Sequence, residues 1–594
     1  MKTYLKYLIV FFTISCSSIA QNATFNWAIG GGGATGADRP VDIVTDKDGN
    51  VFTACSFTNT ATFNGITVSG SEKPAGATNY SSNLFISKIS PGKTTLWKIY
   101  SNEGIIDPTS ITTTPTGDLI VTGIMYAVNL AATNNATLID AQGNKATFTG
   151  LYKFKTDGQQ SFVAKFNTDG VIQWVKEINS GKLKIKGGVL TNSVVTDATG
   201  NVYVTGNFAT CLMLPGSTDS ITSTNTTSAS FITKFNGATG DVVWNKTSSG
   251  GIVSETLNAL TYGDDGYLYA TGVLRNATTA IPVTYGNKTY TPSKGYDLSL
   301  FKLDTDGNFI YIQNREYSGE TRVKDIIVKN GIACISATML GNGTGMSFRD
   351  GDFVTTATTF NGFIAAFSAS DGSDKWQKAI LAPGISDQLY LRYGIDNRLY
   401  AFGYHSNKKA SNPAAAVLFG DGFSLLPLSY VSGSDVFLAS FDANTGTTKE
   451  VHLVASGIDS EMSFGLASYD KYLYLLGQLN SSPTTFEDAS IVTTAGGFDF
   501  YLAKYTIADA TAGYNSIKDS EYAVYNTLEK RLIIRNAEQF SSIYLCDITG
   551  KVVTIIDSQT ERHEINTGNL SKGIYILKLK SKKGLLISQR LLVN

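Results

Sequence analysis

The five tryptophans of this 594-residue chain recur at regular intervals, and this spacing constrains the fold more than any other sequence feature. They are Trp27, Trp97, Trp174, Trp244 and Trp376, at intervals of 70, 77, 70 and 132 residues, the last being two periods of 66. The segments between them are similar to one another and contain short β-rich runs. Such a repeat predicts a radial array of small sheets, a β-propeller, because one unit is too small to bury a core alone.

The clearest unit ends at Trp244 and contains four short runs, at 194–197, 201–206, 231–235 and 241–246. Turns containing Gly, Asp or Asn join the first run to the second and the third to the fourth. β-Branched and aromatic residues favour strands, and such turns join antiparallel neighbours. Each unit is therefore expected to form one four-stranded sheet, with strands A to D in chain order.

The same pattern occurs seven times, but the last copy, which ends at Tyr505, has no strand D. Tyr311 and Val451 replace the tryptophan of strand D in the fourth and sixth copies. The run 24–29 around Trp27 has the pattern of a strand D, but no A, B or C precedes it. We therefore predict an all-β chain whose residues 21–506 form a seven-bladed propeller, with the N-terminal strand completing the seventh blade and leaving no open edge.

The connections from B to C and from D to A are long, whereas those from A to B and from C to D are tight turns. In an antiparallel sheet both long connections lie at the same end, so one face is expected to carry the variable segments. Four of the B-to-C segments predict hairpins around Gly turns, at 62–68, 283–287, 348–353 and 417–423. We expect a ligand first on this insert-bearing face.

The recurring text resembles the bacterial β-propeller repeat family, as in Asn-Val-Tyr-Val-Thr-Gly at 201–206 and Val-Ala-Lys-Phe at 163–166. The resemblance covers residues 24–506. It implies the propeller fold and carries little information on function, because that family is defined largely by architecture.

The N-terminal residues are typical of a secretory signal peptide, with early lysines, an apolar run at 7–14 and small residues up to Ala20. We expect residues 1–20 to be removed between Ala20 and Gln21. Lipidation of Cys16 is the alternative, but Thr13 occupies the position where lipoprotein signals usually carry Leu. The mature chain is expected to have no transmembrane segment. The net charge of −1 for the full chain indicates no nucleic-acid partner.

Composition shifts after a linker at 507–520, and residues 521–594 are expected to form a separate small β-sandwich. The segments 543–553, 570–579 and 590–594 resemble a type A sorting domain of the type IX secretion system. This resemblance implies the secretion machinery as a partner of residues 521–594, and release outside the cell or attachment to its surface. The family's early Tyr-Pro-Asn-Pro is here Tyr525-Asn-Thr527, and an ordinary β-sandwich accessory domain is the alternative.

Signatures of catalysis are scarce in the sequence. Neither G-x-S-x-G nor H-E-x-x-H occurs, and we assign no catalytic residue. His405 and His452 are predicted on the surface, and His563 lies in the C-terminal segment. Gly31-x-Gly33-x-x-Gly36 matches a dinucleotide fingerprint formally, but a strand rather than a helix is expected to follow it.

The four cysteines that remain after signal removal show no paired spacing and are predicted to be small core residues rather than disulfides. They are Cys55, Cys211, Cys334 and Cys546.

Two turns, at 46–50 and 304–308, resemble the start of a calcium loop, because closely spaced carboxylates and a Gly turn suit a hard cation. Their candidate ligands are Asp46, Asp48, Asp304 and Asp306. Both turns lack the downstream bidentate acid of an EF-hand, and Asp, Asn and Gly are also what tight turns require. No other cofactor is expected.

The segments 235–244 and 441–446 resemble the tryptophan-docking motif of quinoprotein propellers. In that family the motif packs neighbouring blades together and does not itself hold the quinone.

We interpret the chain as an exported, non-catalytic module that binds a glycan, a surface polymer or another protein. The alternative is a secreted polysaccharide lyase or hydrolase that uses acids of the insert segments. These acids are Asp350, Asp352, Asp421 and Asp435. A purely structural surface-layer role, which predicts self-association without a ligand, is a third reading.

Overall fold

The computed structural model divides the chain into two compact units, residues 23–510 and a second unit that includes residues 511–594. The described residues are 24–33, 38–70, 83–126, 135–149, 151, 159–180, 188–223, 228–250, 254–276, 282–292, 295–317, 319–340, 346–348, 351–353, 360–382, 385–406, 416–425, 433–456, 460–480, 484–486, 491–492, 498–507, 523–526, 531–535, 537–547, 552–556, 562–571, 573–581 and 586–593. Over these ranges the chain is all β, apart from one 3-10 turn, η3 (Ala537–Gln539). None of these residues belongs to a helix long and apolar enough to cross a membrane.

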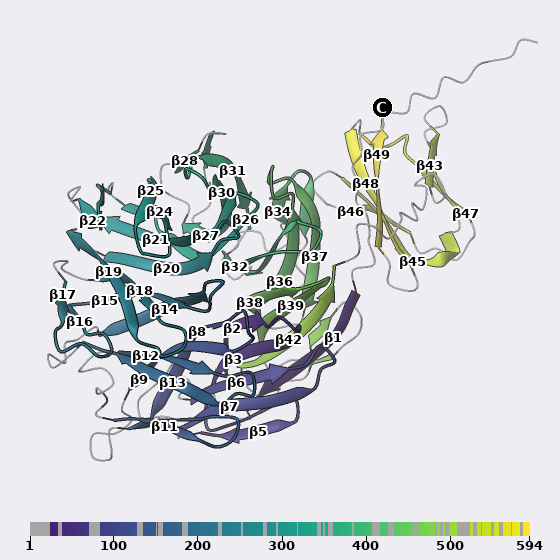
Figure 1. Cartoon of the computed structure of the whole chain (residues 1–594). Coiled ribbons are helices and arrows are strands. Elements are labelled where there is room, and N and C mark those ends of the chain that lie inside the picture. The colour runs from purple at the N-terminus through teal and green to yellow at the C-terminus, as the bar shows by residue number, and fades with distance from the viewer. Residues whose placement is uncertain are drawn as a thin grey trace, which may run out of the picture. The chain divides into compact units, whose positions relative to one another are not determined.

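In the described part of the first unit, seven large sheets each contain four strands in the order A-B-C-D (Figure 1). We number these sheets 1 to 7 in the chain order of their A strands. The A strands are β2 (Arg39–Thr45), β8 (Ile105–Thr113), β14 (Val189–Thr196), β20 (Ser254–Tyr262), β26 (Thr321–Lys329), β32 (Ile385–Tyr393) and β38 (Glu461–Tyr469). The B strands are β3 (Val51–Phe57), β9 (Leu119–Tyr126), β15 (Val202–Phe208), β21 (Leu268–Asn276), β27 (Ile332–Leu340), β33 (Leu399–Ser406) and β39 (Tyr472–Asn480).

The C and D strands follow the predicted pattern as well. The C strands are β6 (Asn83–Ile89), β12 (Gln160–Phe166), β18 (Ala229–Phe235), β24 (Gly295–Leu303), β30 (Phe360–Ser368), β36 (Ser434–Phe441) and β42 (Phe498–Thr506). The D strands are β7 (Thr95–Glu103), β13 (Ile172–Ile178), β19 (Val242–Gly250), β25 (Phe309–Arg315), β31 (Asp374–Ile380), β37 (Thr448–Ser456) and, in sheet 7, β1 (Thr24–Gly32).

The B and C strands are rich in apolar residues and are buried along almost their whole length. Every residue of β3 and of β6 is buried, because both faces of these strands are covered by neighbouring sheets. Strands A and D alternate more between buried and half-exposed residues, as in β2 and β7. The apolar runs therefore mark the strands that lie between two sheets.

Strand β1 pairs antiparallel with β42, the C strand of sheet 7. Thr24 lies opposite Thr506 and Trp27 opposite Lys504, with one irregularity between Phe25 and Trp27. Phe25 is buried and packs against Phe486 and Tyr505. The predicted pairing of the N-terminal strand with the last repeat is thus present in the structure.

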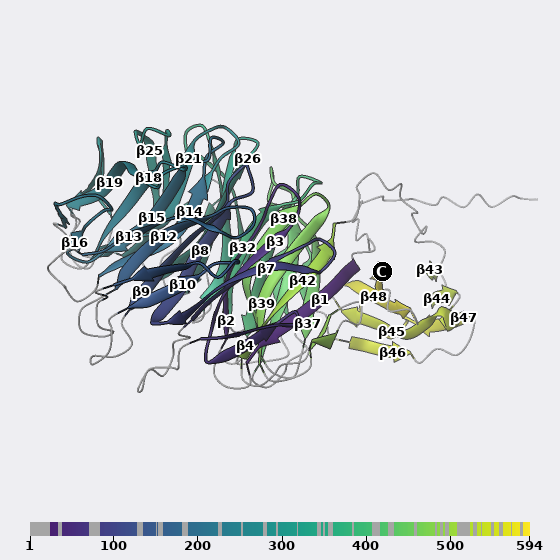
Figure 2. The same ribbon diagram turned by 60° about the horizontal axis from the view of Figure 1, so that its bottom comes forward.

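The A strands lie next to one another from sheet to sheet. β2 contacts β8, and the same contact recurs along the series β8, β14, β20, β26, β32 and β38. β38 in turn contacts β2, so the first and last sheets are neighbours. Figure 1 shows the A strands toward the middle of the unit, and Figure 2 shows the same sheets after a 60° turn.

The four predicted insert hairpins all form: β4–β5 (Thr60–Phe63, Ile66–Ser69), β22–β23 (Val283–Tyr285, Lys288–Tyr290), β28–β29 (Met346–Phe348, Gly351–Phe353) and β34–β35 (Val417–Gly420, Phe423–Leu425). Three further B-to-C hairpins are β10–β11 (Ala136–Ile139, Lys145–Phe148), β16–β17 (Cys211–Leu212, Ile221–Thr222) and β40–β41 (Thr484–Phe486, Ile491–Val492).

Four of these hairpins extend the D strand of the preceding sheet. β4 pairs with β1, β10 with β7, β22 with β19, and β40 with β37. Each hairpin emerges from one sheet and hydrogen-bonds to the outer edge of another. The inserts therefore fasten neighbouring sheets and cover edges that would otherwise be open.

The C-terminal unit has two sheets around one core. One sheet has the order β43 (Ala523–Asn526), β44 (Arg531–Arg535), β47 (Arg562–Asn566), and the other β46 (Val552–Ile556), β45 (Phe540–Asp547), β48 (Gly573–Ser581), β49 (Leu586–Val593). Ile534 and Ile565 from the first sheet pack with Ile543, Leu545 and Leu577 from the second. This packing is the expected β-sandwich.

Candidate functional site

Four of the recurring tryptophans join their sheet to the next one through a backbone carbonyl in the C-to-D turn of that next sheet. The indole N–H of Trp174 in sheet 2 donates to the Gly237 carbonyl of sheet 3 at 3.3 Å, and that of Trp376 in sheet 5 donates to the Ala443 carbonyl of sheet 6 at 2.9 Å. Equivalent bonds run from Trp97 to Thr168 and from Trp244 to Thr305. These tryptophans are therefore inter-sheet fasteners.

Several C strands carry a lysine at the third position of the recurring text, as Lys165 does in Val-Ala-Lys-Phe. This lysine binds the same carbonyl as the tryptophan. Lys165 Nζ lies 2.9 Å from the Gly237 carbonyl, which also accepts the Trp174 bond. The pairs Lys88 with Trp97 and Lys234 with Trp244 repeat this arrangement. One carbonyl thus holds both an ammonium and an indole of the preceding sheet.

In each C-to-D turn that meets a tryptophan, a glycine makes room for the indole. Gly240 has φ = 71°, and a Cβ there would lie 2.7 Å from the Trp174 ring. Gly446 has φ = 70°, and a Cβ there would lie 2.5 Å from the Trp376 ring. A side chain is excluded at both positions by backbone conformation and by space.

Sheet 7 joins sheet 1 by the same kind of contact. Lys504 Nζ of sheet 7 donates to the Pro91 carbonyl in the C-to-D turn of sheet 1 at 3.1 Å. The Thr45 hydroxyl of sheet 1 donates to the Ser468 carbonyl of sheet 7 at 3.0 Å, and Gln478 donates to the Asp38 carbonyl at 2.7 Å.

Each A strand contains a register irregularity at one equivalent place, and the polar residues there bind the neighbouring sheet. The Asp42 carboxylate accepts the N–H of Ile111 at 2.8 Å, and that of Asp325 accepts the N–H of Leu391 at 2.9 Å. The bulges thus turn inner-strand side chains into links between sheets.

Charged side chains of sheets 1, 5 and 6 meet at this level. Burial lowers the pKa of Lys324, and the negative charges of Asp42, Asp325 and Asp387 partly oppose that effect. Arg392 Nη1 lies 2.8 Å from the Asp325 carboxylate. Arg39 also acts on Lys324, so three cationic side chains accompany three carboxylates, which suits a structural layer better than an anion or cation site.

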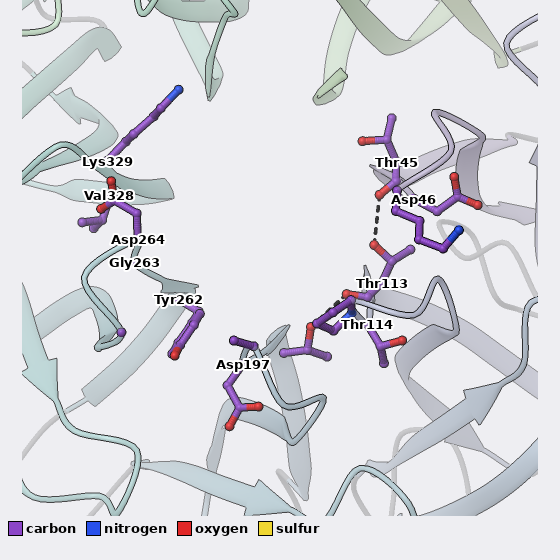
Figure 3. A pocket seen from close by; sticks show the side chains of 15 residues that line it. Thr45, Asp46, Thr113, Thr114, Asp197, Tyr262, Gly263, Asp264, Val328 and Lys329 are labelled. Carbon is purple, nitrogen blue, oxygen red and sulfur yellow. Dashed lines mark hydrogen bonds between the residues drawn. The ribbon is translucent and has the colours of Figure 1, made fainter. Parts of the chain in front are cut away.

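A cavity of about 760 Å³ lies at the A-to-B turns of sheets 1 to 5 (Figure 3). This end of the sheets is opposite to the insert hairpins, because each B strand runs from its A-to-B turn toward its insert. The lining residues are Thr45, Asp46, Lys47, Thr113, Thr114, Pro115, Thr196, Asp197, Ala198, Tyr262, Gly263, Asp264, Gly266, Val328 and Lys329. No single sequence motif marks this cavity, because its lining comes from five separate turns.

Three threonine hydroxyls of the cavity donate hydrogen bonds to backbone carbonyls of neighbouring sheets. Thr113 donates to the Thr45 carbonyl at 2.9 Å, and Thr196 donates to the Thr113 carbonyl at 2.8 Å. Thr45 makes the corresponding bond to sheet 7. These hydroxyl oxygens can therefore act only as acceptors toward a molecule in the cavity.

The buried acids of the cavity are already bonded. Burial alone would raise the pKa of Asp197, but hydrogen bonds from Asn201, Thr199 and Tyr203 hold it below its usual value. Asp46 is likewise buried, and Asn50 and Lys88 lower its pKa.

The candidate calcium residues occupy turns in which donors surround the first carboxylate. Asp46 accepts the N–H groups of Asp48 and Asn50 and pairs with Lys88 at 3.1 Å. Asp304 accepts the N–H of Asp306, and Asn308 donates to both of its oxygens. A cation at either turn would have to displace these donors, and calcium binding stays a prediction.

The expectation that His405 lies on the surface was wrong. His405 lies in strand β33 with 1% of its surface exposed, and burial lowers its pKa to about 4. Its Nε2 is 3.7 Å from the Asp435 carboxylate, which is also buried. The strand continues past the Gly that ends the repeat text, so His405 falls inside the sheet. His452 in β37 is half-buried beside Glu450, and the side chain of His563 lies outside the described part.

The described acids of the insert segments lie in different surroundings. Asp421, at the tip of the β34–β35 hairpin, binds Lys378 Nζ and the N–H of Thr448, each at 2.7 Å. Asp435 lies in the buried start of β36 beside His405. Asp352 is placed only by its backbone in β29, and Asp350 lies outside the described residues.

All four cysteines are free and buried, as expected of core residues. Burial raises the pKa of Cys334 to about 12. Gly31 lies in strand β1 and Gly33 follows the end of that strand, whereas Gly36 lies outside the described residues.

Residues 526–594 match the family model described as the secretion system C-terminal sorting domain. The chain therefore carries a C-terminal type IX secretion sorting domain, which indicates secretion or cell-surface attachment. Among curated proteins, none matches the sequence.

Three solved structures illustrate the structural likenesses. A protein of unknown function from Dyadobacter fermentans is 9% identical, with 82% of this chain and 99% of that chain covered and a TM-score of 0.36. The quinohemoprotein alcohol dehydrogenase of Comamonas testosteroni is 11% identical, with 86% and 80% covered and a TM-score of 0.31. A europium-containing methanol dehydrogenase is 10% identical, with 68% and 93% covered and a TM-score of 0.28. These low scores carry no conclusion about activity.

Proposed function

We propose that the chain is an exported seven-bladed β-propeller, closed by its N-terminal strand, that binds a glycan, a surface polymer or a protein without chemical turnover. Closure is supported by the β1–β42 pairing, by the contact of β38 with β2, and by the Lys504 bond to the Pro91 carbonyl. Delivery through the type IX system is the task of the C-terminal domain.

The lining of the cavity carries the proposal of binding without catalysis. An enzyme that cleaves glycosidic bonds needs two carboxyl groups poised as acid and base. Of the three carboxylates in the lining, Asp46 and Asp197 have depressed pKa values and are held by hydrogen bonds, so neither suits a proton donor at neutral pH. The third, Asp264, accepts the backbone N–H of Asn330 at 2.8 Å.

Incubation of the mature chain with a panel of polysaccharides tests this proposal. Retention of a polysaccharide or protein without release of new reducing ends or unsaturated ends is expected. Turnover would contradict the binding role, and concentration-dependent self-association with no retained ligand would favour the surface-layer reading instead.

A further inference from the structure

We infer that the cavity at the A-to-B turns, rather than the insert-bearing face, is the ligand site, and that it takes a neutral saccharide. This inference rests on the proposed binding function and deepens it. It moves the expected site to the opposite end of the sheets.

The insert hairpins have another use in the structure. Four of them pair with the outer strand of the preceding sheet, so one edge of each is already bonded. Asp421, at the tip of a further hairpin, is bound by Lys378. These contacts assign the inserts to holding sheets together.

The cavity instead presents an aromatic ring and polar groups to a ligand. Its volume of about 760 Å³ falls in the range of small-molecule sites. Tyr262 is half-buried, and Figure 3 shows its ring at the rim of the open space, across from Thr45 and Thr113. An aromatic ring beside polar groups is a suitable surface for the apolar face of a sugar.

The hydrogen-bonding chemistry narrows the ligand class. The hydroxyls of Thr45, Thr113 and Thr196 donate hydrogen bonds to backbone carbonyls, so their oxygens can only accept hydrogen bonds from the ligand. Lys329 supplies a donor at one side of the cavity, and the Lys47 ammonium has three N–H groups, so it can still donate to a ligand beside its pairing with Asp48. A sugar hydroxyl both donates and accepts, so a polyhydroxylated molecule satisfies both sets.

Charge argues against an acidic sugar. Lys47 is paired with Asp48 at 2.8 Å, and the lining includes the carboxylates of Asp46, Asp197 and Asp264. Two ammonium groups therefore face three carboxylates, of which only Asp46 is paired with a lysine from outside the lining, Lys88. A carboxylated saccharide would meet no net positive charge here.

Calorimetric titration of the mature chain with neutral oligosaccharides of glucose, xylose and mannose tests the inference, with oligogalacturonate as the acidic comparison. Tyr262→Ala is expected to weaken binding of the neutral ligand about tenfold or more, with a fall in melting temperature similar to that of Tyr296→Ala, because both tyrosines pack against a core cluster. Tyr296→Ala is the matched control, because Tyr296 is also half-buried but lies at the start of β24, at the other end of the sheet. It is expected to bind like the unaltered protein.

Three outcomes would overturn the site. Neutral saccharide binding that Tyr262→Ala leaves intact would place the ligand elsewhere and still support a binding module. Preference for oligogalacturonate would refute the neutral ligand. Retention of a protein but no saccharide would refute the inference and leave the proposed function standing, whereas turnover of the saccharide would refute that function itself.

Discussion

At the scale of single residues, four of the five marker tryptophans are explained by one bond each. Their spacing was readable from the sequence, but their role in holding a carbonyl of the next sheet was not, because the partner lies 58 to 71 residues away along the chain, as in Tyr311 with Ala369 and Trp97 with Thr168. The lysine that shares this carbonyl was visible in the recurring C-strand text, yet no local pattern reveals its target. His405 was misplaced for a related reason, since burial depends on the neighbouring sheets.

The carbonyl that Trp174 binds has a second donor and the one that Trp376 binds does not, so replacing the two tryptophans by Phe should lower the free energy of unfolding by different amounts. Trp174 and Trp376 are both buried, but only the Trp174 carbonyl has a second donor, Lys165, whereas Ala366 takes the lysine position in sheet 5. Trp376→Phe leaves the Ala443 carbonyl without that donor and should lower the free energy of unfolding by about 1 kcal/mol more than Trp174→Phe. Denaturant titration of both variants measures the difference, and equal losses would refute the shared-carbonyl explanation.

Asp38 predicts a pH dependence of stability. Burial, together with the nearby Asp499 charge, raises its pKa to about 7, although it accepts N–H bonds from Thr58 and Gly33. The folded state binds the proton more tightly than the unfolded chain does, so this contribution is complete below about pH 4 and is lost as the pH rises through 7. The contribution of Asp38 to the free energy of unfolding should be roughly a few kcal/mol at most.

The free energy of unfolding, measured at pH 5 and at pH 8, tests the predicted loss of stability with rising pH. Asp38→Asn should flatten the decline between the two pH values. Asp107, whose pKa is raised to about 6 by burial and offset by Arg39 and Ser56, acts in the same direction and should leave a smaller residual slope in the variant. An unchanged slope in Asp38→Asn would contradict the assignment.

At the scale of elements, the sequence predicted the strands and their order within each sheet, but not the pairing of the insert hairpins with the preceding sheet. Apolar runs and Gly turns located all four strand types, and the four insert hairpins formed where expected. The pairing of hairpins such as β10–β11 with the preceding sheet could not be foreseen, since alternation along a strand does not say which edge it joins. The cavity was missed because no single element contains it.

The N-terminal strand gives a test at this scale. Ala28 is buried opposite Ala503, whereas the neighbouring Asn26 is exposed and accepts a hydrogen bond from Thr506 at 2.6 Å. Ala28→Asp places an unpaired charge inside the β1–β42 seam and should destabilise the first unit by about 3 kcal/mol. Asn26→Asp adds the same charge, keeps the acceptor and should change little. Thermal unfolding compares them, and equal melting temperatures would show that β1 does not stabilise the seam.

At the scale of the whole molecule, the chain divides labour between an N-terminal unit of repeated sheets and a C-terminal sorting domain. The resemblance of the C-terminal segment was sufficient to predict its role, because that role depends on a recognised sequence pattern. The ligand of the first unit was not predictable in the same way, because its cavity is assembled from five distant turns.

Removal of residues 526–594 provides the corresponding prediction. The truncated chain should retain its β-sheet circular dichroism, since the first unit has its own core, but should fail to leave the producing bacterium. Cell fractionation and immunoblotting measure its location, with the full-length chain as control. Normal secretion of the truncated chain would show that the sorting domain is dispensable.

The pairing of Thr24 with Thr506 has a mechanical consequence. The chain continues from Thr506 toward the sorting domain, so a cell that holds the protein by its C-terminal side pulls first on β42. That strand is not an edge: β39 and β1 both bond to it along nearly its whole length. A pull along β42 must shear two hydrogen-bonded ladders at once instead of peeling one, so the strand that begins the folded chain also reinforces the point where the load enters.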